Sequence, residues 1–367
     1  MIEVDVLVVG LGPAGGSAAF ATAIAGLNVL AIDRKRAVGQ PVQCAEFVPM
    51  PMLRYCQGDG VLRQRIEAMK TFLPSSARVT SDFPGLMIDR ARFDQSIAAA
   101  AAAAGARLCL GARLSALDPG GSRATFLANS DPLPREVRYR VLIAADGPRS
   151  TVARLLGLAP LPCVQTRQYT VSLLRGYGDT DIWLSDEFPG GYAWLFPKGA
   201  KANLGVGADR RFETDLKVPL ERLHHRLVAE GLLGVKIHGR TGGDIPVGGV
   251  RTLLVSGNIL FSGDAAGLAH PITGAGIAAG VISGERAGLA AVERLCRKDP
   301  RAFDSFEEDV RDQFEETLAR AVERRRWLDG QWRTSKASED AVMKRGWIAF
   351  PEYFSEHLPK AELTAVF

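Results

Sequence analysis

A thiol and a carboxylate stand two residues apart in the segment Pro41-Val42-Gln43-Cys44-Ala45-Glu46. A thiol can donate a proton or tune a nearby redox group, and a carboxylate can orient a loop or relay protons. A free cysteine is more often a small buried hydrophobe, and a loop acid is often simply solvated. Cys44 and Glu46 are therefore candidate catalytic residues if other elements of the chain build a redox site around them.

The N-terminus carries a strand, a turn and a helix of the kind that binds dinucleotides. Residues 4–9 form a nearly continuous apolar run, which predicts a strand buried on both faces of a parallel sheet. A helix then runs from Pro13 to about residue 25, and its first N–H groups, including that of Ala14, can face a pyrophosphate. The glycines of the turn permit its tight geometry, the close approach of the phosphates and the packing of the helix: Gly10, Gly12 and Gly15.

The next strand, residues 28–32, ends at an acid. Asp33, followed by Arg34, stands where a carboxylate can accept hydrogen bonds from the hydroxyl groups of an adenosine ribose. The turn alone does not distinguish NAD from FAD.

A second Gly-rich turn follows a buried strand at residues 253–261. It includes Gly263 and Asp264 and continues through Gly274 and Gly276 to Ile277. Two such turns, far apart in sequence, predict a flavin dinucleotide held at both ends by one discontinuous domain.

The composition excludes several classes of protein. The net charge of +4 over 367 residues indicates no nucleic-acid partner and at most peripheral contact with an anionic membrane. Residues 265–284 carry no charged side chain, but Pro271 and the glycines argue against a membrane-spanning helix. Five cysteines, no metal-ligand spacing and no N-terminal signal segment predict free thiols, no metal site and a cytoplasmic location.

The order of elements predicts an α/β fold, α+β overall. We expect a discontinuous, Rossmann-like FAD-binding domain from residues 1–75, 85–160 and 251–299. Residues 161–250 contain short strands rich in aromatic residues and threonine, which predicts an inserted antiparallel-sheet substrate domain. Residues 300–367 are expected to form a C-terminal helical cap. In that cap, the basic run Arg324-Arg325-Arg326 is expected to be a solvated helix face, with contact to anionic lipid as the alternative.

Taken in order, these motifs resemble the geranylgeranyl reductase family, within the FAD proteins built like para-hydroxybenzoate hydroxylase. The resemblance rests on the Cys44-Ala45-Glu46 loop, the Tyr-x-Trp-x-Phe-Pro motif in residues 190–197, Ala145-Asp146-Gly147, and the turn from Gly263 to Ile277. It covers roughly residues 1–290. Phe47 stands where the family usually has glycine, so the pocket beside the flavin can have a different shape here.

This resemblance implies FAD as cofactor and assigns contacts to it residue by residue. The expected cofactor-binding residues, from motif and resemblance together, are Gly10, Gly12, Pro13, Ala14, Gly15, Asp33, Arg34, Cys44, Ala45, Arg90, Leu114, Asp146, Gly147, Gly263, Asp264, Gly274, Gly276 and Ile277.

Tyr192 and Trp194 alternate on one strand, so both project from one face. Such aromatic rows are usually core, but the family match implies that these two side chains line a lipid pocket. Phe196, next in the row, is expected to serve packing alone.

The expected reaction is reduction of C=C bonds in a prenyl or other hydrophobic substrate by hydride from reduced flavin. A monooxygenase or a halogenase on the same fold is the alternative, because the Tyr-x-Trp-x-Phe-Pro segment is close to a halogenase pattern. A third possible function is that of a non-catalytic flavin protein that carries electrons. Since there is no second Gly-x-Gly-x-x-Gly between residues 169 and 250, the electron donor is expected to be NAD(P)H bound without a domain of its own, ferredoxin or another donor.

Overall fold

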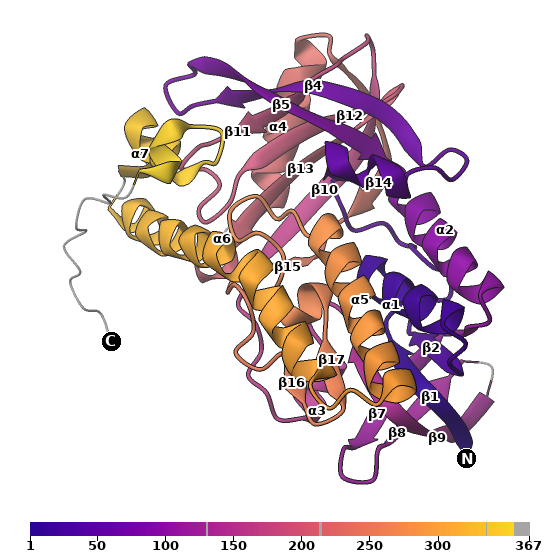
Figure 1. Cartoon of the computed structure of the whole chain (residues 1–367). Coiled ribbons are helices and arrows are strands. Elements are labelled where there is room, and N and C mark those ends of the chain that lie inside the picture. Colours follow the sequence, from indigo (N-terminus) through magenta and orange to yellow (C-terminus); the bar gives the residue numbers. More distant parts are fainter. Residues whose placement is uncertain (130, 213–214, 335, 356–367) are drawn as a thin grey trace.

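The computed structural model describes residues 1–129, 131–212, 215–334 and 336–355. Within these residues the strands form two sheets, with the first in the lower half of the molecule and the second in the upper half (Figure 1). Helices cover both, as the mixed α/β prediction requires.

The first sheet has eight strands and holds the dinucleotide turn. Its central strands β9, β1 and β2 are parallel, and β17 extends the parallel part beyond β9. The strands of this sheet are β1 (Ile2–Val9), β2 (Val29–Asp33), β6 (Arg107–Leu110), β7 (Ala112–Asp118), β8 (Arg123–Ala128), β9 (Asp131–Ala144), β16 (Val255–Ser256) and β17 (Ile259–Phe261).

Small residues allow α1 (Pro13–Ile24) and α5 (Ile277–Val292) to pack closely on this sheet, where Figure 1 shows them side by side. A Cβ atom on Gly284 of α5 would lie 2.1 Å from the backbone oxygen of Ala14, so the two backbones touch. The strands beneath are buried through aliphatic residues such as Leu7 and Ile143. Helices α2 (Arg90–Ala103) and α3 (Thr151–Leu155) complete this half.

The second sheet has nine strands, and most of its pairs are antiparallel. Helix α4 (Lys217–Ala229) packs its apolar side, including Leu220 and Leu223, on one face of it. The strands are β3 (Phe47–Pro49), β4 (Leu62–Phe72), β5 (Arg78–Ile88), β10 (Cys163–Leu173), β11 (Thr180–Trp183), β12 (Ala193–Lys198), β13 (Lys201–Asp209), β14 (Leu233–Thr241) and β15 (Asp244–Pro246).

One part of the chain lies elsewhere than its sequence position indicated. Residues 1–75 are expected in the FAD-binding domain, but β3 and β4 within them, and β5 after them, belong to the second sheet, because β4 pairs in parallel with β11. Residues 69–72 align with residues 180–183, a pairing across more than a hundred residues that no local pattern announces. The division into domains itself stays a prediction.

The C-terminal part is helical. Helix α6 (Ala302–Arg333) runs along the molecule, and the short α7 (Asp340–Gly346) lies beside the second sheet (Figure 1). Residues 130, 213–214, 335 and 356–367, which fall in the predicted segments 85–160, 161–250 and 300–367, lie outside the described part. Among the helices that the structure describes, none combines the length and the apolar character needed to cross a membrane.

Candidate active site

The two Gly-rich turns, separated by about 250 residues in the chain, meet in the structure. A Cβ atom on Gly263 would lie 2.9 Å from that of Ala14, and the Gly263 N–H donates to the Ser283 hydroxyl at 2.9 Å. Pro13 also lies close to α5, since a Cβ on Gly280 would be 3.5 Å from its Cβ. The start of α1, the late turn and the start of α5 therefore form one site.

The first turn has the close backbone approaches that a dinucleotide turn requires. Gly10 has a φ of +98°, and a Cβ there would lie 2.3 Å from the Ala145 oxygen. A Cβ on Gly15 would lie 1.8 Å from the Gly10 oxygen, so neither position tolerates a side chain. The N-cap residue of α1 is Gly12, and no side chain caps that helix.

Helix α5 begins in the same way, at Ile277 after the N-cap residue Gly276, without a side-chain cap. The free N–H groups and the dipole of a helix N-terminus favour negative charge. Two uncapped helix starts on one site, with room above Gly12 where a Cβ would meet nothing within 4 Å, fit the phosphates and the ring of FAD.

Asp33 stands at the carboxyl end of β2, as expected. One of its carboxylate oxygens accepts from the Leu11 N–H at 2.7 Å, and the other accepts from the Lys35 N–H at 2.7 Å. These bonds hold the acid against the first turn, which is where a ribose would lie. Arg34 beside it is exposed.

Asp264 lies on the late turn, η3 (Gly263–Ala266), and faces the start of α5. A Cβ on Gly276 would be 3.0 Å from its Oδ1 atom. Burial raises the pKa of Asp264 to about 6, although the positive charge of Arg90 opposes this shift. Arg90 begins α2 and makes two hydrogen bonds to buried Asp94, at 3.0 and 2.8 Å.

Cys44 lies near the same site, in the loop before β3. Burial raises the pKa of its thiol above the usual value, and Arg90 counteracts part of that shift. The Sγ atom accepts a hydrogen bond from the Glu46 N–H at 3.2 Å. The balance keeps the thiol protonated at neutral pH, which suits a proton donor.

Glu46 is a buried anchor, only 2% exposed, with a φ of +72° that side-chain-bearing residues rarely adopt. Its carboxylate accepts from the Arg90 N–H at 2.9 Å, from Lys198 Nζ at 2.5 Å and from Asn203 Nδ2 at 2.7 Å. These donors come from α2, β12 and β13, so one carboxylate ties the Cys44 loop to both halves of the molecule.

Tyr192 and Trp194 form an aromatic wall on the second sheet, and their ring centroids are 5.7 Å apart. The Tyr192 hydroxyl donates to the Thr273 oxygen at 2.5 Å, which joins this wall to the loop before α5. Burial, and next the charge of nearby Cys44, raise the pKa of Tyr192. Trp194 Nε1 donates to Gln168 Oε1 and Gln168 Nε2 donates to the Cys44 oxygen, so the wall stands close to the Cys44 loop. The ring centroids of Phe196 and Phe47 are 5.9 Å apart, in line with the packing role expected for Phe196.

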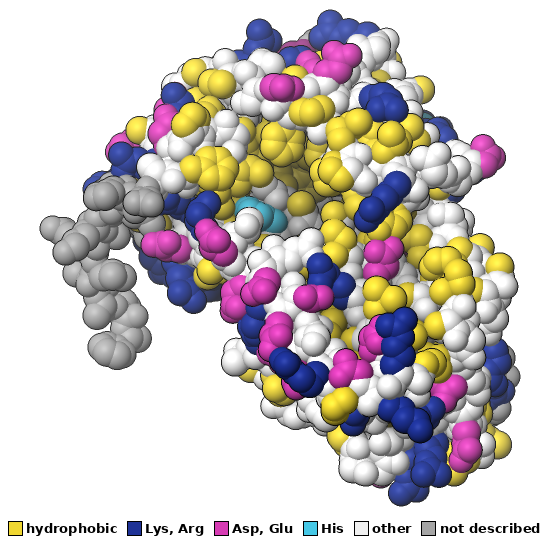
Figure 2. Space-filling model, in the orientation of Figure 1, with side chains coloured by type: hydrophobic (Ala, Val, Ile, Leu, Met, Phe, Trp, Pro, Cys, Tyr) yellow, Lys and Arg dark blue, Asp and Glu magenta, His cyan; other side chains and the backbone are white. Residues whose placement is uncertain are grey.

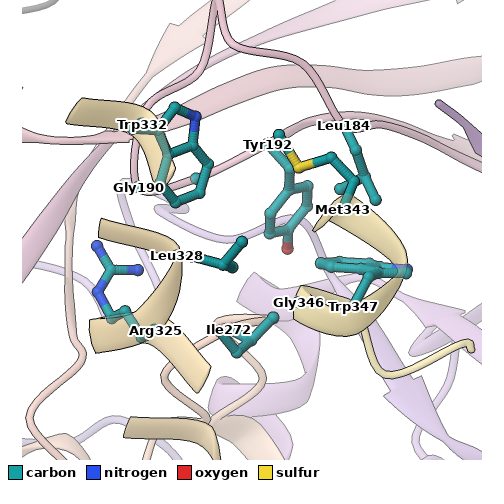
Figure 3. Close-up of a pocket in the computed structure, with 11 residues that line it drawn as sticks. Leu184, Gly190, Tyr192, Ile272, Arg325, Leu328, Trp332, Met343, Gly346 and Trp347 are labelled. Carbon is teal, nitrogen blue, oxygen red and sulfur yellow. The ribbon is translucent and has the colours of Figure 1, made fainter. Parts of the chain in front are cut away.

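A cavity with an empty volume of about 340 Å³, including its opening to solvent, lies beside Tyr192 (Figure 3). Its lining is mostly apolar and includes Leu184, Ile272, Leu328 and Met343. The Trp347 ring of the C-terminal segment lies 4.8 Å from that of Tyr192. On the visible face of the molecule, a hollow bordered largely by hydrophobic side chains separates the upper half from the lower (Figure 2).

The remaining predicted contacts have defined positions. Asp146 follows β9, and its carboxylate accepts from the Thr151 and Val152 N–H groups in the first turn of α3, whose N-cap residue is Ser150. Gly147 follows with a φ of +87°, and Gly274 has a φ of +71° in the loop before α5. Ala45 shares the Cys44 loop. Leu114 is buried in the core of the first half, on β7 opposite Phe126.

The solvated helix face expected at residues 324–326 is wrong for two of the three arginines. Arg324 and Arg325 are buried, and only Arg326 is exposed. Arg325 donates to Asp209 at 2.9 Å and to the Pro271 oxygen at 3.3 Å. The correction arises because α6 packs this face against β13 and the loop at residue 271, which charge alone does not reveal.

Sequence reasoning also missed Gln168, Lys198, Asn203 and Trp347. The first three are polar residues on strands of the second sheet that contact the Cys44 loop, more than 120 residues away in sequence. For Lys198, its position directly after the Tyr-x-Trp-x-Phe-Pro motif was an available signal. No motif marked Gln168, Asn203 or Trp347.

Comparisons with known proteins agree with this geometry. Residues 3–183 match the family described as FAD binding domain, and residues 161–230 match the geranylgeranyl reductase catalytic domain. The chain is 35% identical to digeranylgeranylglycerophospholipid reductase 1 of Methanopyrus kandleri, over 86% of this chain and 88% of the relative. The chain belongs to the geranylgeranyl reductase family. It is an FAD-dependent oxidoreductase, as expected.

Two further proteins support the assignment of this chain to the geranylgeranyl reductase family, and a third shows how widely the fold is shared. The Methanococcus aeolicus digeranylgeranylglycerophospholipid reductase is 31% identical, with 81% of this chain and 80% of the relative covered. A crystal structure described as geranylgeranyl bacteriochlorophyll reductase-like, from Thermoplasma acidophilum, has a TM-score of 0.82 at 28% identity, covering 92% of each chain. A probable FAD-dependent monooxygenase of Pseudomonas aeruginosa has a TM-score of 0.69 at 17% identity, covering 91% of this chain and 99% of its own, and shows the shared fold alone.

Proposed function

We propose that this protein saturates C=C bonds in the prenyl chains of a glycerophospholipid. The relatives named as digeranylgeranylglycerophospholipid reductases support this substrate class. The observation that carries the proposal is the aromatic wall of Tyr192 and Trp194, which stands beside the Cys44 loop and an apolar cavity. An apolar chain can lie against such a wall while its double bond faces the thiol.

Reduction of an alkene requires a hydride on one carbon and a proton on the other, and bound reduced FAD supplies the hydride. The chain would hold that cofactor with the first turn, Asp33 and the uncapped starts of α1 and α5. Cys44 donates the proton to the second carbon and regains one from solvent, because burial holds its thiol in the protonated form. The apolar lining excludes water from the double bond.

The roles of Cys44 and Glu46 differ in this proposal. Cys44 is the proton donor, because desolvation raises the pKa of its thiol more than Arg90 lowers it, so the thiol carries a proton. Glu46 holds the loop, because its three donors already occupy the carboxylate. A proton relay through Glu46 would require it to leave those bonds.

The test is anaerobic reduction of the purified holoenzyme followed by mixing with a digeranylgeranylglycerophospholipid. Rapid return of the oxidised flavin spectrum, with a mass gain of two hydrogens for each alkene, is the expected result. No anaerobic reaction, together with substrate-dependent oxygen uptake and an added oxygen atom, would show a monooxygenase instead. Failure of every alkene to reoxidise the flavin would favour an electron carrier.

We further propose NAD(P)H or ferredoxin as electron donor, and contact with a membrane surface only at the periphery. The donor is the one that bleaches the bound flavin faster under anaerobic conditions. Peripheral contact predicts that the protein sediments with vesicles of a glycerophospholipid and is released without detergent.

A further inference from the structure

Two buried amide side chains face the Cys44 loop from neighbouring strands. Gln168 lies on β10 and Asn203 on β13, and they are 4% and 1% exposed. Thr170 pairs with Asn203 across these antiparallel strands, so Gln168, two residues before Thr170, shares its face of the sheet. The two amides are therefore diagonal neighbours on one face.

Each amide donates to one of two consecutive carbonyl groups of the loop. Gln168 Nε2 donates to the Cys44 oxygen at 3.0 Å, and Asn203 Nδ2 donates to the Ala45 oxygen at 3.2 Å. The same Asn203 nitrogen lies 2.7 Å from a Glu46 carboxylate oxygen. All three residues of the Cys-Ala-Glu motif are thus held by this pair of strands.

The orientation of Gln168 is determined by the aromatic wall. Trp194 Nε1 donates to Gln168 Oε1 at 3.1 Å, and an indole N–H can only donate. The amide oxygen must therefore face Trp194, which leaves the amide nitrogen facing the Cys44 carbonyl. A continuous chain of hydrogen bonds joins the aromatic wall to the backbone of Cys44.

We propose that Gln168 and Asn203 are positioning residues that fix the Cys44 thiol relative to the aromatic wall. Buried amides of this kind are costly to leave unpaired, so the loop has one strongly preferred position. The catalytic consequence rests on the proposed function, in which the double bond lies between wall and thiol. The positioning itself can be measured without any substrate.

The test is the rate at which iodoacetamide alkylates Cys44 in the FAD-bound protein, followed by peptide mass spectrometry. In Gln168→Met, which keeps the volume and loses both hydrogen bonds, we expect Cys44 to react about tenfold faster, because the loop loses its fixed position and the half-buried thiol becomes more accessible. The other cysteines serve as internal references: Cys56, Cys109, Cys163 and Cys296.

The matched control is Gln64→Met. Gln64 is a half-buried amide on β4 that donates to the Tyr177 oxygen at 2.6 Å and accepts from the Gly199 N–H at 2.9 Å. Within the part of the chain that the structure describes, neither of these two hydrogen bonds reaches the Cys44 loop, so loss of the Gln64 amide should leave the Cys44 rate unchanged. If Gln168→Met fails to fold, Trp194→Phe carries the test, since it removes the indole donor and keeps an aromatic ring, and an increase of about twofold is expected.

Unchanged Cys44 alkylation in the folded Gln168 or Trp194 variant would overturn the proposal. So would an equal rise at Cys56, Cys109 and Cys163, which are buried or half-buried, because that would show general loosening. A selective rise at Cys44 in a protein that reduces no alkene would support the positioning role and contradict the proposed function.

Discussion

At the scale of single residues, the environment of Cys44 keeps its side chain as a neutral thiol that can donate a proton. Desolvation raises the pKa of the half-buried Cys44 thiol, and Arg90, whose charge opposes this shift, is engaged by Asp94 through two hydrogen bonds. A guanidinium paired in this way stabilises a thiolate less than a free one would. The chain therefore keeps a protonated thiol at the place where we propose that the flavin and the substrate meet.

Replacement of Cys44 by alanine tests this role directly. We expect turnover of the prenyl substrate to fall at least about tenfold, because the proton must then come from solvent. Binding of FAD, measured from the ratio of flavin to protein absorbance, should not change. Full turnover by Cys44→Ala would contradict proton donation by this thiol.

The anchoring role of Glu46 predicts an effect on stability. In Glu46→Gln, the amide nitrogen would face at least one donor in either orientation, and Lys198 would lose its carboxylate partner in a site where it is largely buried. We expect a loss of about 3 kcal/mol in the free energy of unfolding, measured with urea. The double variant Glu46→Gln with Lys198→Met should recover part of this loss, and equal losses in the two proteins would argue against an anchor.

At the scale of elements, α6 is attached to the second sheet by a buried ion pair. Asp209 at the end of β13 accepts hydrogen bonds from Arg211 and from Arg325 of α6, and these bonds outweigh burial and hold its pKa at about 2. Arg325 also borders the cavity beside Tyr192. The pair therefore positions one wall of that cavity.

The depressed pKa of Asp209 gives this attachment a pH dependence. Its contribution to stability is fully present above the unfolded value of 3.8 and is lost as the pH falls toward 2, up to about 2 kcal/mol. Asp209→Asn should lower the melting temperature by a constant amount between pH 7 and pH 4. The difference from the unaltered protein should shrink below pH 4, and a difference that widens there would contradict the assignment.

At the scale of the whole molecule, the candidate site combines parts from the entire chain. The first sheet supplies the dinucleotide turn, the second supplies the aromatic wall and the amides, and the C-terminal segment supplies Trp347. The Trp347 ring meets that of Tyr192 with an interplanar angle of 63°. The predicted C-terminal cap thus also borders the cavity.

Trp347→Ala tests whether this segment contributes to substrate binding. Removal of the indole enlarges the cavity beside Tyr192 and removes apolar contact, so we expect the KM for the prenyl lipid to rise about tenfold with little change in kcat. Leu174→Ala, at an exposed residue outside the cavity, is the control. A change in kcat alone would mean that Trp347 serves the chemical step.

The sequence by itself determined the features that depend on neighbouring residues. Backbone constraint makes the turn at Gly10 to Gly15 recognisable, strand periodicity predicts the shared face of Tyr192 and Trp194, and Asp33 follows from its position at a strand end. The family resemblance, the FAD cofactor and the fold class were predicted from these local motifs in order, and all three are confirmed.

Only the tertiary structure decided which distant residues meet. The parallel pairing of β4 with β11, the burial of Arg324 and Arg325, and the contacts of Gln168 and Asn203 with the Cys44 loop all join segments far apart in the chain. A glutamine on a strand looks the same in sequence whether it meets solvent or a loop carbonyl. The packing of the two halves decides between solvent and a carbonyl partner. It determines which polar groups are removed from water and must therefore form hydrogen bonds within the protein.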